Sequence, residues 1–461
     1  MANCDKYLLY RQRRRRAGST DEWEFVTPAV YSVNGDGTQP LYIMASTDDI
    51  NCCPNSGGGG GDTPSAGDTE WRVVSGEYNC SGTTKVQRLQ LYQYNGSQWV
   101  AMQQFRDGNV IEEESVDCGY VPTPDTPYAE QYFTIVPTSG GYIRWSGNTD
   151  ISSNNTLSYS TNSGASWSSY SSYQNISVSA GNKIMFKGQL VGGSVQGNYY
   201  GAGTFSGSTA TFNVEGNSMS LIYDSNFTGQ TALDGKSSVF MYLLSGTKVV
   251  DASNFVLPAT YVTTHAYDGM FNNCTGLTLV PTLPATELTT CSYDGMFRGC
   301  TSLVVPPSLP ATSLASFCYE NMFNGCTSLT TAPALPATTL AVYCYSGMFN
   351  GCTNLASAPT LPSTSMQEHC YERMFQGCTR LTTAPRLAAT TIADYAYRYM
   401  FYGCTSLNSV TCLATTFDGS NCTYQWLYNV ASTGTFTKAS SITGWTTGTS
   451  GIPSGWTTQN A

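Results

Sequence analysis

The C-terminal half of the chain repeats every 26 residues, and this period constrains its fold more than any other feature. The repeat is marked by Met-Phe pairs, which begin at Met270, Met296, Met322, Met348, Met374 and Met400. Cys residues from Cys274 to Cys404 and Tyr residues from Tyr267 to Tyr397 keep the same step. A fixed period of about 20–50 residues is typical of a solenoid, in which each coil buries its apolar face against its neighbours. The register predicts a continuous stack of coils over 257–427.

The sequence of a single repeat predicts one short strand, a turn and one short helix or helical turn. Leu340, Cys344 and Met348 lie four residues apart, a spacing that places them on one face of a helix. Gly351 follows where a left-handed C-cap residue is expected. The segment 352–361 is predicted to be extended, and stacked coils would pair such strands in a parallel sheet.

The repeat resembles a known family. The pattern MFxGCTSLTxAPxLPATTL, read from Met322 to Leu340, is similar to the leucine-rich repeats of the BspA-like bacterial surface proteins. It departs from their commonest version by a Pro-rich LPAT element in place of Ile-Pro-x-x-Val. The resemblance implies a leucine-rich-repeat solenoid on an adhesive or surface-exposed protein, and it covers a little over a third of the chain.

Composition indicates an extended, β-rich protein that works outside the cytoplasm. Charged residues make up 11% of the chain, against about 25% in ordinary soluble proteins, and there are 31 Tyr and 45 Gly. The formal net charge of −10 argues against general nucleic-acid binding. The sequence contains no run of about 18 apolar residues, so membrane insertion is not expected. The first residues, MANCDKYLLYRQRRRRAG, carry the charge of a signal peptide without its apolar core.

The fold class is predicted to be mostly β and multidomain, with small N-terminal β modules, a β-sandwich and the C-terminal solenoid. Gly-rich and Pro-rich stretches separate the parts. The predicted parts are a β module (1–55), a Gly-rich linker (56–69), a second β module (70–119), a Pro-rich linker (120–129), a β-sandwich (130–236), the solenoid with an N-terminal cap (237–430) and a C-terminal cap (431–461).

This order of parts resembles virion proteins of phages that infect gut Bacteroidales. The resemblance rests on two features. One is the pair of short modules that each contain a Trp and end at a Cys (Trp23 and Cys52; Trp99 and Cys118), and the other is the tail GIPSGW at 451–456. The resemblance implies a head-fibre or tail-appendage protein located on the virion. A bacterial cell-surface or extracellular adhesin, exported by a non-classical route, is the alternative.

The Cys and His residues, which often act in catalysis or metal binding, are better explained here by structural roles. The Cys columns are expected to be buried free thiols, with disulfides or metal binding as alternatives. His265 and His369 share a repeat position with Cys291, Phe317, Tyr343 and Tyr395, as a surface or rim position would. We expect the protein to have no enzymatic activity and to bind no cofactor. A glycan-cleaving appendage is the alternative, for which the β-sandwich offers Asp150, Glu215 and Asp224 as carboxylates.

Binding is expected in positions that vary between repeats while facing outward. Polar and aromatic side chains at such positions suit hydrogen bonding and stacking with a host glycan or protein. The candidate ligand-binding residues are Asp268, Asn272, Arg298, Glu320, Asn324, Glu372, Arg386, Arg398 and Tyr402. The arginine run Arg11, Arg13, Arg14, Arg15 and Arg16 is the candidate contact to other virion proteins, with a solvated strand or tail as the alternative. A homo-oligomer is expected, because weak surface contacts gain from multivalency.

Overall fold

The computed structural model divides into two compact units, 1–125 and 126–461. In the first unit it describes only the strands 29–31, 41–43, 69–75, 85–94, 99–101 and 113–116. In the second it describes residues from 127 onward except 149–154, 234, 418 and 443. The candidate anchoring arginines Arg11 and Arg13 to Arg16 lie outside the described residues, as do the two predicted linkers apart from residues 69 and 127–129.

The described strands of the first unit form two antiparallel sheets. Strands β1 (Ala29–Tyr31) and β2 (Leu41–Ile43) pair with each other. Strand β4 (Lys85–Tyr94) pairs with β3 (Thr69–Ser75), β5 (Trp99–Ala101) and β6 (Glu113–Val116). The two predicted β modules therefore both contain strands.

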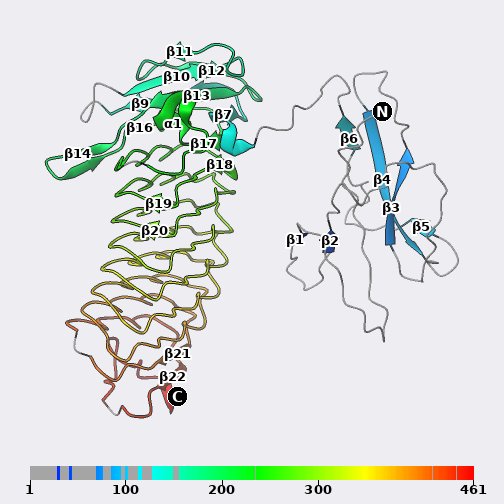
Figure 1. The fold of residues 1–461 in the computed structure, drawn as a ribbon. Helices are drawn as coiled ribbons and strands as arrows, with labels where there is room; N and C mark the ends of the chain where they lie inside the picture. The colour runs from blue at the N-terminus through cyan, green and yellow to red at the C-terminus, as the bar shows by residue number, and fades with distance from the viewer. Residues whose placement is uncertain are drawn as a thin grey trace. The chain divides into compact units, whose positions relative to one another are not determined.

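The second unit begins with a sheet region over 127–236, drawn in cyan and green in Figure 1. Its main sheet has the order β11-β10-β13-β7-β17-β18, and small two-stranded sheets accompany it. The elements up to the solenoid are η2 (Tyr128–Glu130), β7 (Phe133–Pro137), β8 (Gly141–Ile143), β9 (Ser146–Gly147), β10 (Thr156–Ser160), β11 (Ser168–Ser169), β12 (Ile176–Val178), β13 (Ile184–Gln189), β14 (Gly193–Val195), β15 (Asn198–Tyr200), β16 (Gly203–Thr204), β17 (Phe212–Asn217), α1 (Ser220–Tyr223) and η3 (Asp224–Asn226).

The sheet region and the solenoid share one hydrophobic core. Strand β17 pairs in parallel with β18 (Asn254–Val256), which belongs to the repeats. Across this junction the ring of Phe255 packs on Phe133 at 5.3 Å and on Phe271 at 6.4 Å between centroids. The apolar start of the stack is therefore covered by the sheet, which protects it from water and from pairing with another chain.

The fold is mostly β, with very little helix, and the solenoid makes about eight turns over residues 261–460 (Figure 1). The extended segments of successive coils pair in parallel but briefly, as in β19 (Tyr261–Val262) with β20 (Glu287–Leu288). Beside Pro281 and the equivalent prolines of the next four repeats, pairing is limited to single bridges such as that of Thr331 with Ser357, because proline has no N–H to donate. Where the equivalent residue is Thr411, a regular strand forms, β21 (Ser409–Cys412).

The short helix predicted for each repeat is wrong. The corresponding residues form turn segments, in which every fourth residue has a positive φ, for example Tyr343 (56°), Gly347 (61°) and Gly351 (74°). A left-handed residue at each fourth position cannot belong to an α-helix. Leu340, Cys344 and Met348 are buried as predicted, because a turn repeat of four residues places the same positions inward as a helix does. The turn segments are 238–246, 265–273, 291–299, 317–325, 343–351, 369–377, 395–403 and 421–429.

Backbone hydrogen bonds between coils hold the turn segments together. Alternate N–H groups of one segment donate to carbonyls of the next coil, as Tyr345 N–H does to the Cys370 carbonyl at 3.1 Å and Phe349 N–H to the Met374 carbonyl at 2.9 Å. The intervening N–H groups donate three residues back within their own coil, as Met348 does to Tyr345. The pattern begins at Ser238, whose N–H donates to the Thr264 carbonyl, so the predicted N-terminal cap forms a coil like the others.

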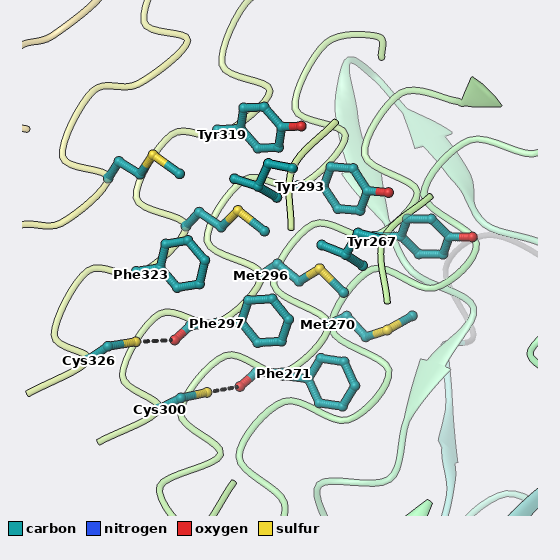
Figure 2. Packing of buried hydrophobic residues seen from close by; sticks show 14 of the residues in the cluster. Tyr267, Met270, Phe271, Tyr293, Met296, Phe297, Cys300, Tyr319, Phe323 and Cys326 are labelled. Atoms are coloured by element: carbon teal, nitrogen blue, oxygen red, sulfur yellow. Dashed lines mark hydrogen bonds between the residues drawn. The ribbon is translucent and has the colours of Figure 1, made fainter. Parts of the chain in front are cut away.

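Identical side chains stack in rows inside the solenoid, as Figure 2 shows for its Tyr, Met, Phe and Cys residues. Neighbouring Phe rings lie 5.5–5.7 Å apart from Phe271 to Phe349 and are nearly parallel. Neighbouring Tyr rings from Tyr267 to Tyr371 lie 5.6–5.9 Å apart. The rows account for the unbroken register of the sequence, because an insertion in one coil would displace every row.

The tail predicted as a C-terminal cap extends the sheet instead of only covering it. Strands β22 (Gly434–Lys438) and β23 (Trp456–Asn460) follow β21 in parallel. Trp426 and Trp445 stack over the last coil at 5.5 Å between centroids.

Candidate functional site: the face formed by the turn segments

The prediction that the acidic side chains of the turn segments face outward is wrong for two of them, which are buried. Asp268 is 5% exposed and Glu372 is 2% exposed. Each carboxylate accepts from a histidine three residues earlier: His265 Nδ1 lies 2.8 Å from Asp268, and His369 Nδ1 contacts Glu372. The left-handed conformation of both histidines turns the chain so that imidazole and carboxylate meet on one side of the coil.

Stacking of coils also brings acidic side chains together. Burial first, and then the charges of Asp268 and Glu320, raise the pKa of Asp294 to about 8, while Arg298 opposes the shift. Burial raises the pKa of Glu320 to about 7, against a hydrogen bond with Ser346. Burial also raises the pKa of Asp268. The carboxyl groups of Asp294 and Glu320 therefore bind protons near neutral pH, which weakens them as direct ligands for cations.

An aromatic row runs along the same face at the first left-handed position of each turn segment. Phe317, Tyr343, His369 and Tyr395 stack at centroid distances of 4.9, 4.1 and 4.5 Å. The faces of these rings cover one another, so most of the row presents only ring edges to a ligand. Both predicted histidines lie at this position, but the ring of His265 packs against Tyr199 in a tilted arrangement, with 4.1 Å between centroids.

Arginine and tyrosine side chains gather on the last coils. We define the Arg–Tyr cluster as Arg373, Tyr395, Arg398, Tyr399, Tyr402, Tyr424 and Tyr428. Both guanidinium groups lie over the ring of Tyr399, that of Arg373 at 5.3 Å and that of Arg398 at 5.1 Å. Tyr424 and Tyr428 remain 40% and 41% exposed.

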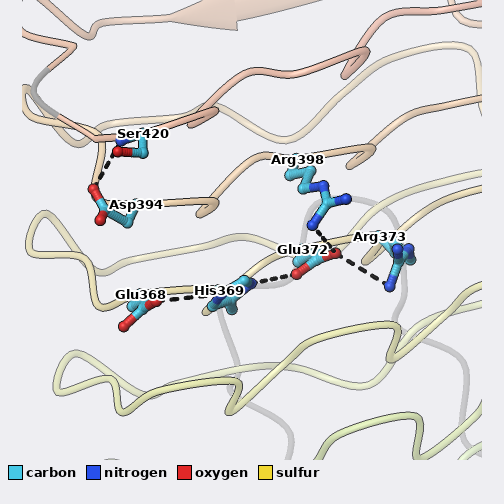
Figure 3. A network of polar contacts seen from close by, with 7 residues as sticks. All are labelled: Glu368, His369, Glu372, Arg373, Asp394, Arg398 and Ser420. Atoms are coloured by element: carbon cyan, nitrogen blue, oxygen red, sulfur yellow. Dashed lines mark hydrogen bonds and ion pairs between the residues drawn. The ribbon is translucent and has the colours of Figure 1, made fainter.

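Glu372 lies at the centre of a polar network beside this cluster, as Figure 3 shows. One of its oxygens, Oε1, lies 3.1 Å from Arg373 Nη1 and 3.7 Å from Arg398 Nη1. The other contacts His369, whose Nε2 lies 3.3 Å from Glu368. The buried carboxylate thus holds two arginines from adjacent coils in fixed positions.

The structure brings together some of the predicted ligand residues and separates others. Arg398 and Tyr402 belong to the Arg–Tyr cluster. Asn272, Arg298 and Asn324 occupy the position of Tyr402 in earlier coils, and Arg386 is exposed on the extended segment of its coil. The sequence reasoning missed Arg373, Tyr399, Tyr424 and Tyr428. The sequence does mark Arg373 and Tyr399 as unusual. They occupy the left-handed repeat position that is Gly or Asn in earlier coils, at Gly295, Asn321 and Gly347.

The carboxylates considered for glycan cleavage lie in ion pairs where the structure describes them. Glu215 contacts Lys183 at 2.6 Å and Asp224 contacts Lys187 at 2.8 Å; Asp150 lies outside the described residues. Among the described residues, no group of three or more His, Cys, Asp or Glu side chains could hold a metal ion. Within the same residues, no helix has the length and apolar character needed to cross a membrane.

Comparison with known proteins agrees with the fold of the repeats. Residues 251–399 and 316–438 match the family described as BspA type leucine rich repeat region, with six copies of the repeat. No curated protein and no solved structure matches the chain. The chain therefore carries BspA-type leucine-rich repeats, as a surface or adhesin-like repeat protein does.

Proposed function

We propose that this protein is a non-enzymatic phage appendage that attaches the particle to a host surface through its leucine-rich repeats. The observation that carries the proposal is the Arg–Tyr cluster. In a chain with only 11% charged residues, two arginines and five tyrosines meet on three adjacent coils. Arg and Tyr are the residue types enriched at the energetic centres of binding interfaces.

The rest of the turn face supports recognition at the cluster more than along the whole solenoid. In the earlier coils the acidic side chains are wholly or partly buried, and the aromatic row exposes ring edges. Recognition at the last coils places the binding surface far along the chain from the N-terminal modules, which we propose contact other virion proteins and a second copy of the chain.

The virion setting rests on the order of the modules and on the GIPSGW tail. Its test is mass spectrometry of purified phage particles, with the expectation that the protein is found among the structural proteins. Detection instead in the envelope of a bacterium, with none in particles, would favour the adhesin alternative.

The attachment role is tested with the intact chain. We expect labelled protein to bind host cells, and the double substitution Arg398→Gln with Tyr428→Ala to reduce that binding by at least about tenfold. Arg380→Ala is the matched control, because Arg380 is exposed and contacts Asn354 of the preceding coil rather than the cluster. Unchanged binding by the double variant would contradict the role of the cluster. Release of soluble sugar from a host polysaccharide would contradict the non-enzymatic role.

A further inference from the structure

We infer that Arg373 and Arg398 form a binding site for the carboxylate of an acidic saccharide. The inference rests on the proposed attachment role and names the ligand class for the same surface. Nothing in the repeat pattern requires two arginines here, since the position of Arg373 is Gly in three of the four preceding coils and Asn in the other.

The two guanidinium groups are held side by side by the fold. The backbone N–H of Arg373 donates to the carbonyl of Arg398 at 2.9 Å, so the two residues are neighbours across adjacent coils. Both side chains then pack on Tyr399, and Arg398 also lies over Tyr395 at 5.4 Å. A pair fixed in this way loses little side-chain entropy when a ligand binds.

The charges of the pair are not balanced by their shared partner. Two guanidinium groups contact a single carboxylate oxygen, Glu372 Oε1, and in the part of the chain that the structure describes both ion pairs use Nη1. Each guanidinium carries five N–H donors. Among the described residues, Nε and Nη2 of both arginines have no hydrogen-bond or ion-pair partner, so these donors are available to a ligand. Their side chains are 44% and 30% exposed. Planar forks of this kind match a carboxylate with two parallel hydrogen bonds.

The tyrosines beside the pair favour a sugar as the carrier of the carboxylate. Tyr402 and Tyr428 stack at 5.0 Å, and Tyr428 lies at the last turn segment with a large exposed fraction. An exposed ring offers an apolar face for the C–H side of a sugar and a hydroxyl for its polar edge. A stable protein interface needs about 20–30 residues on each side, whereas this cluster has seven.

The test uses the full chain and three polymers. Polygalacturonate supplies a carboxylate on every sugar, its fully methyl-esterified form has the same sugars without that charge, and poly-glutamate has the carboxylates without sugar. We expect polygalacturonate to bind at least about tenfold more tightly than either of the others, because charged bidentate pairs and ring contacts both contribute.

Substitutions then assign the binding to the pair. Arg373→Gln with Arg398→Gln is expected to abolish the preference for the free acid. Arg398→Lys, which keeps the charge but loses the fork, should retain only part of it. Arg380→Ala should bind as the unmodified chain does, and thermal unfolding of each variant checks that it is folded.

Each outcome separates the two proposals. Equal binding of the acid and its ester, equal binding of poly-glutamate, or unchanged binding by the double glutamine variant overturns the saccharide-carboxylate site. If host cells bind the chain while polygalacturonate does not, this inference fails and the attachment role stands. If neither binds, both fail.

Discussion

The thiol of Cys326 donates a hydrogen bond to the backbone carbonyl of Phe297 in the preceding coil, with 3.1 Å between sulfur and oxygen. The same bond joins Cys300 to Phe271, as Figure 2 also shows. It recurs further along the row, from Cys352 to Phe323. It explains why the repeats keep Cys at a site where any small apolar residue would fit, since the S–H group adds a contact between coils.

The thiols of the repeats should not react in the folded protein. Burial raises the pKa of Cys326 to about 12, so almost no thiolate exists near neutral pH. The chain has 17 cysteines, and the 12 that the structure describes are buried and free. When the native protein is treated with a thiol reagent in the absence of a reducing agent, we expect at most the other five cysteines to react quickly. Rapid modification of the repeat cysteines, mapped by peptide mass spectrometry, would contradict this.

Substitution of Cys326 separates its hydrogen bond from its packing. We expect Cys326→Ala to lower the free energy of unfolding by about 1–2 kcal/mol, through the lost bond and a small cavity. Cys326→Ser keeps a donor and should cost less than Cys326→Ala, as measured by urea denaturation. If the serine variant is the less stable of the two, the site acts mainly as an apolar contact and the bond contributes little.

Glycine is needed at position 351 because of the backbone conformation there, and not because a Cβ atom would lack room. Its φ is 74°, and a Cβ there would meet Gly325 at 3.7 Å, an ordinary contact. We therefore expect Gly351→Ala to cost about 1–2 kcal/mol, the penalty for a left-handed residue, and Gly351→Asn to cost less.

Gly299 provides the comparison, because a Cβ at that site would lie 2.3 Å from Asn273 Oδ1. The Gly299→Ala variant should be less stable than Gly351→Ala in the same denaturation assay. Equal stability of the two would show that the side chain of Asn273 moves aside at no cost.

The solenoid should become less stable as pH rises. The pKa of Asp294 rises from 3.8 to about 8 and that of Glu320 from 4.5 to about 7, so the folded state binds protons more tightly than the unfolded chain. Stability is then greatest at acidic pH, where both groups are protonated in either state, and falls as the pH passes from about 4 to about 8. A loss of 1 kcal/mol lowers Tm by about 2–4 °C in a domain of some 150–250 residues.

Calorimetry across that range measures the effect. The Asp294→Asn variant should show a weaker decrease in Tm, because its side chain no longer titrates. Glu287→Gln, at an exposed site in β20, is the control and should follow the unmodified chain. A Tm that rises with pH between about 5 and 8 would contradict the assignment.

The sequence alone determined the repeat fold, because its evidence is a pattern of identities. The register of Leu, Cys, Tyr and Met-Phe predicted a solenoid of stacked coils with these residues inside, and the structure confirms both. The helix within each coil was a wrong prediction for a specific reason. Apolar residues four apart fit a helix and a four-residue turn equally well, and the two differ in whether the N–H groups bond within the coil or to the next one.

Only the tertiary structure decided the conformation and grouping of the surface residues. Phe317, Tyr343 and His369 hold positive φ values that such side chains rarely adopt. Each is stabilised there by its backbone N–H, which donates to a carbonyl of the neighbouring coil. The ion pair of Glu372 with Arg398 likewise forms only because Arg398 arrives from the next coil. The Arg–Tyr cluster exists because residues 26 positions apart become neighbours when the coils stack, and local sequence preferences carry no record of that contact.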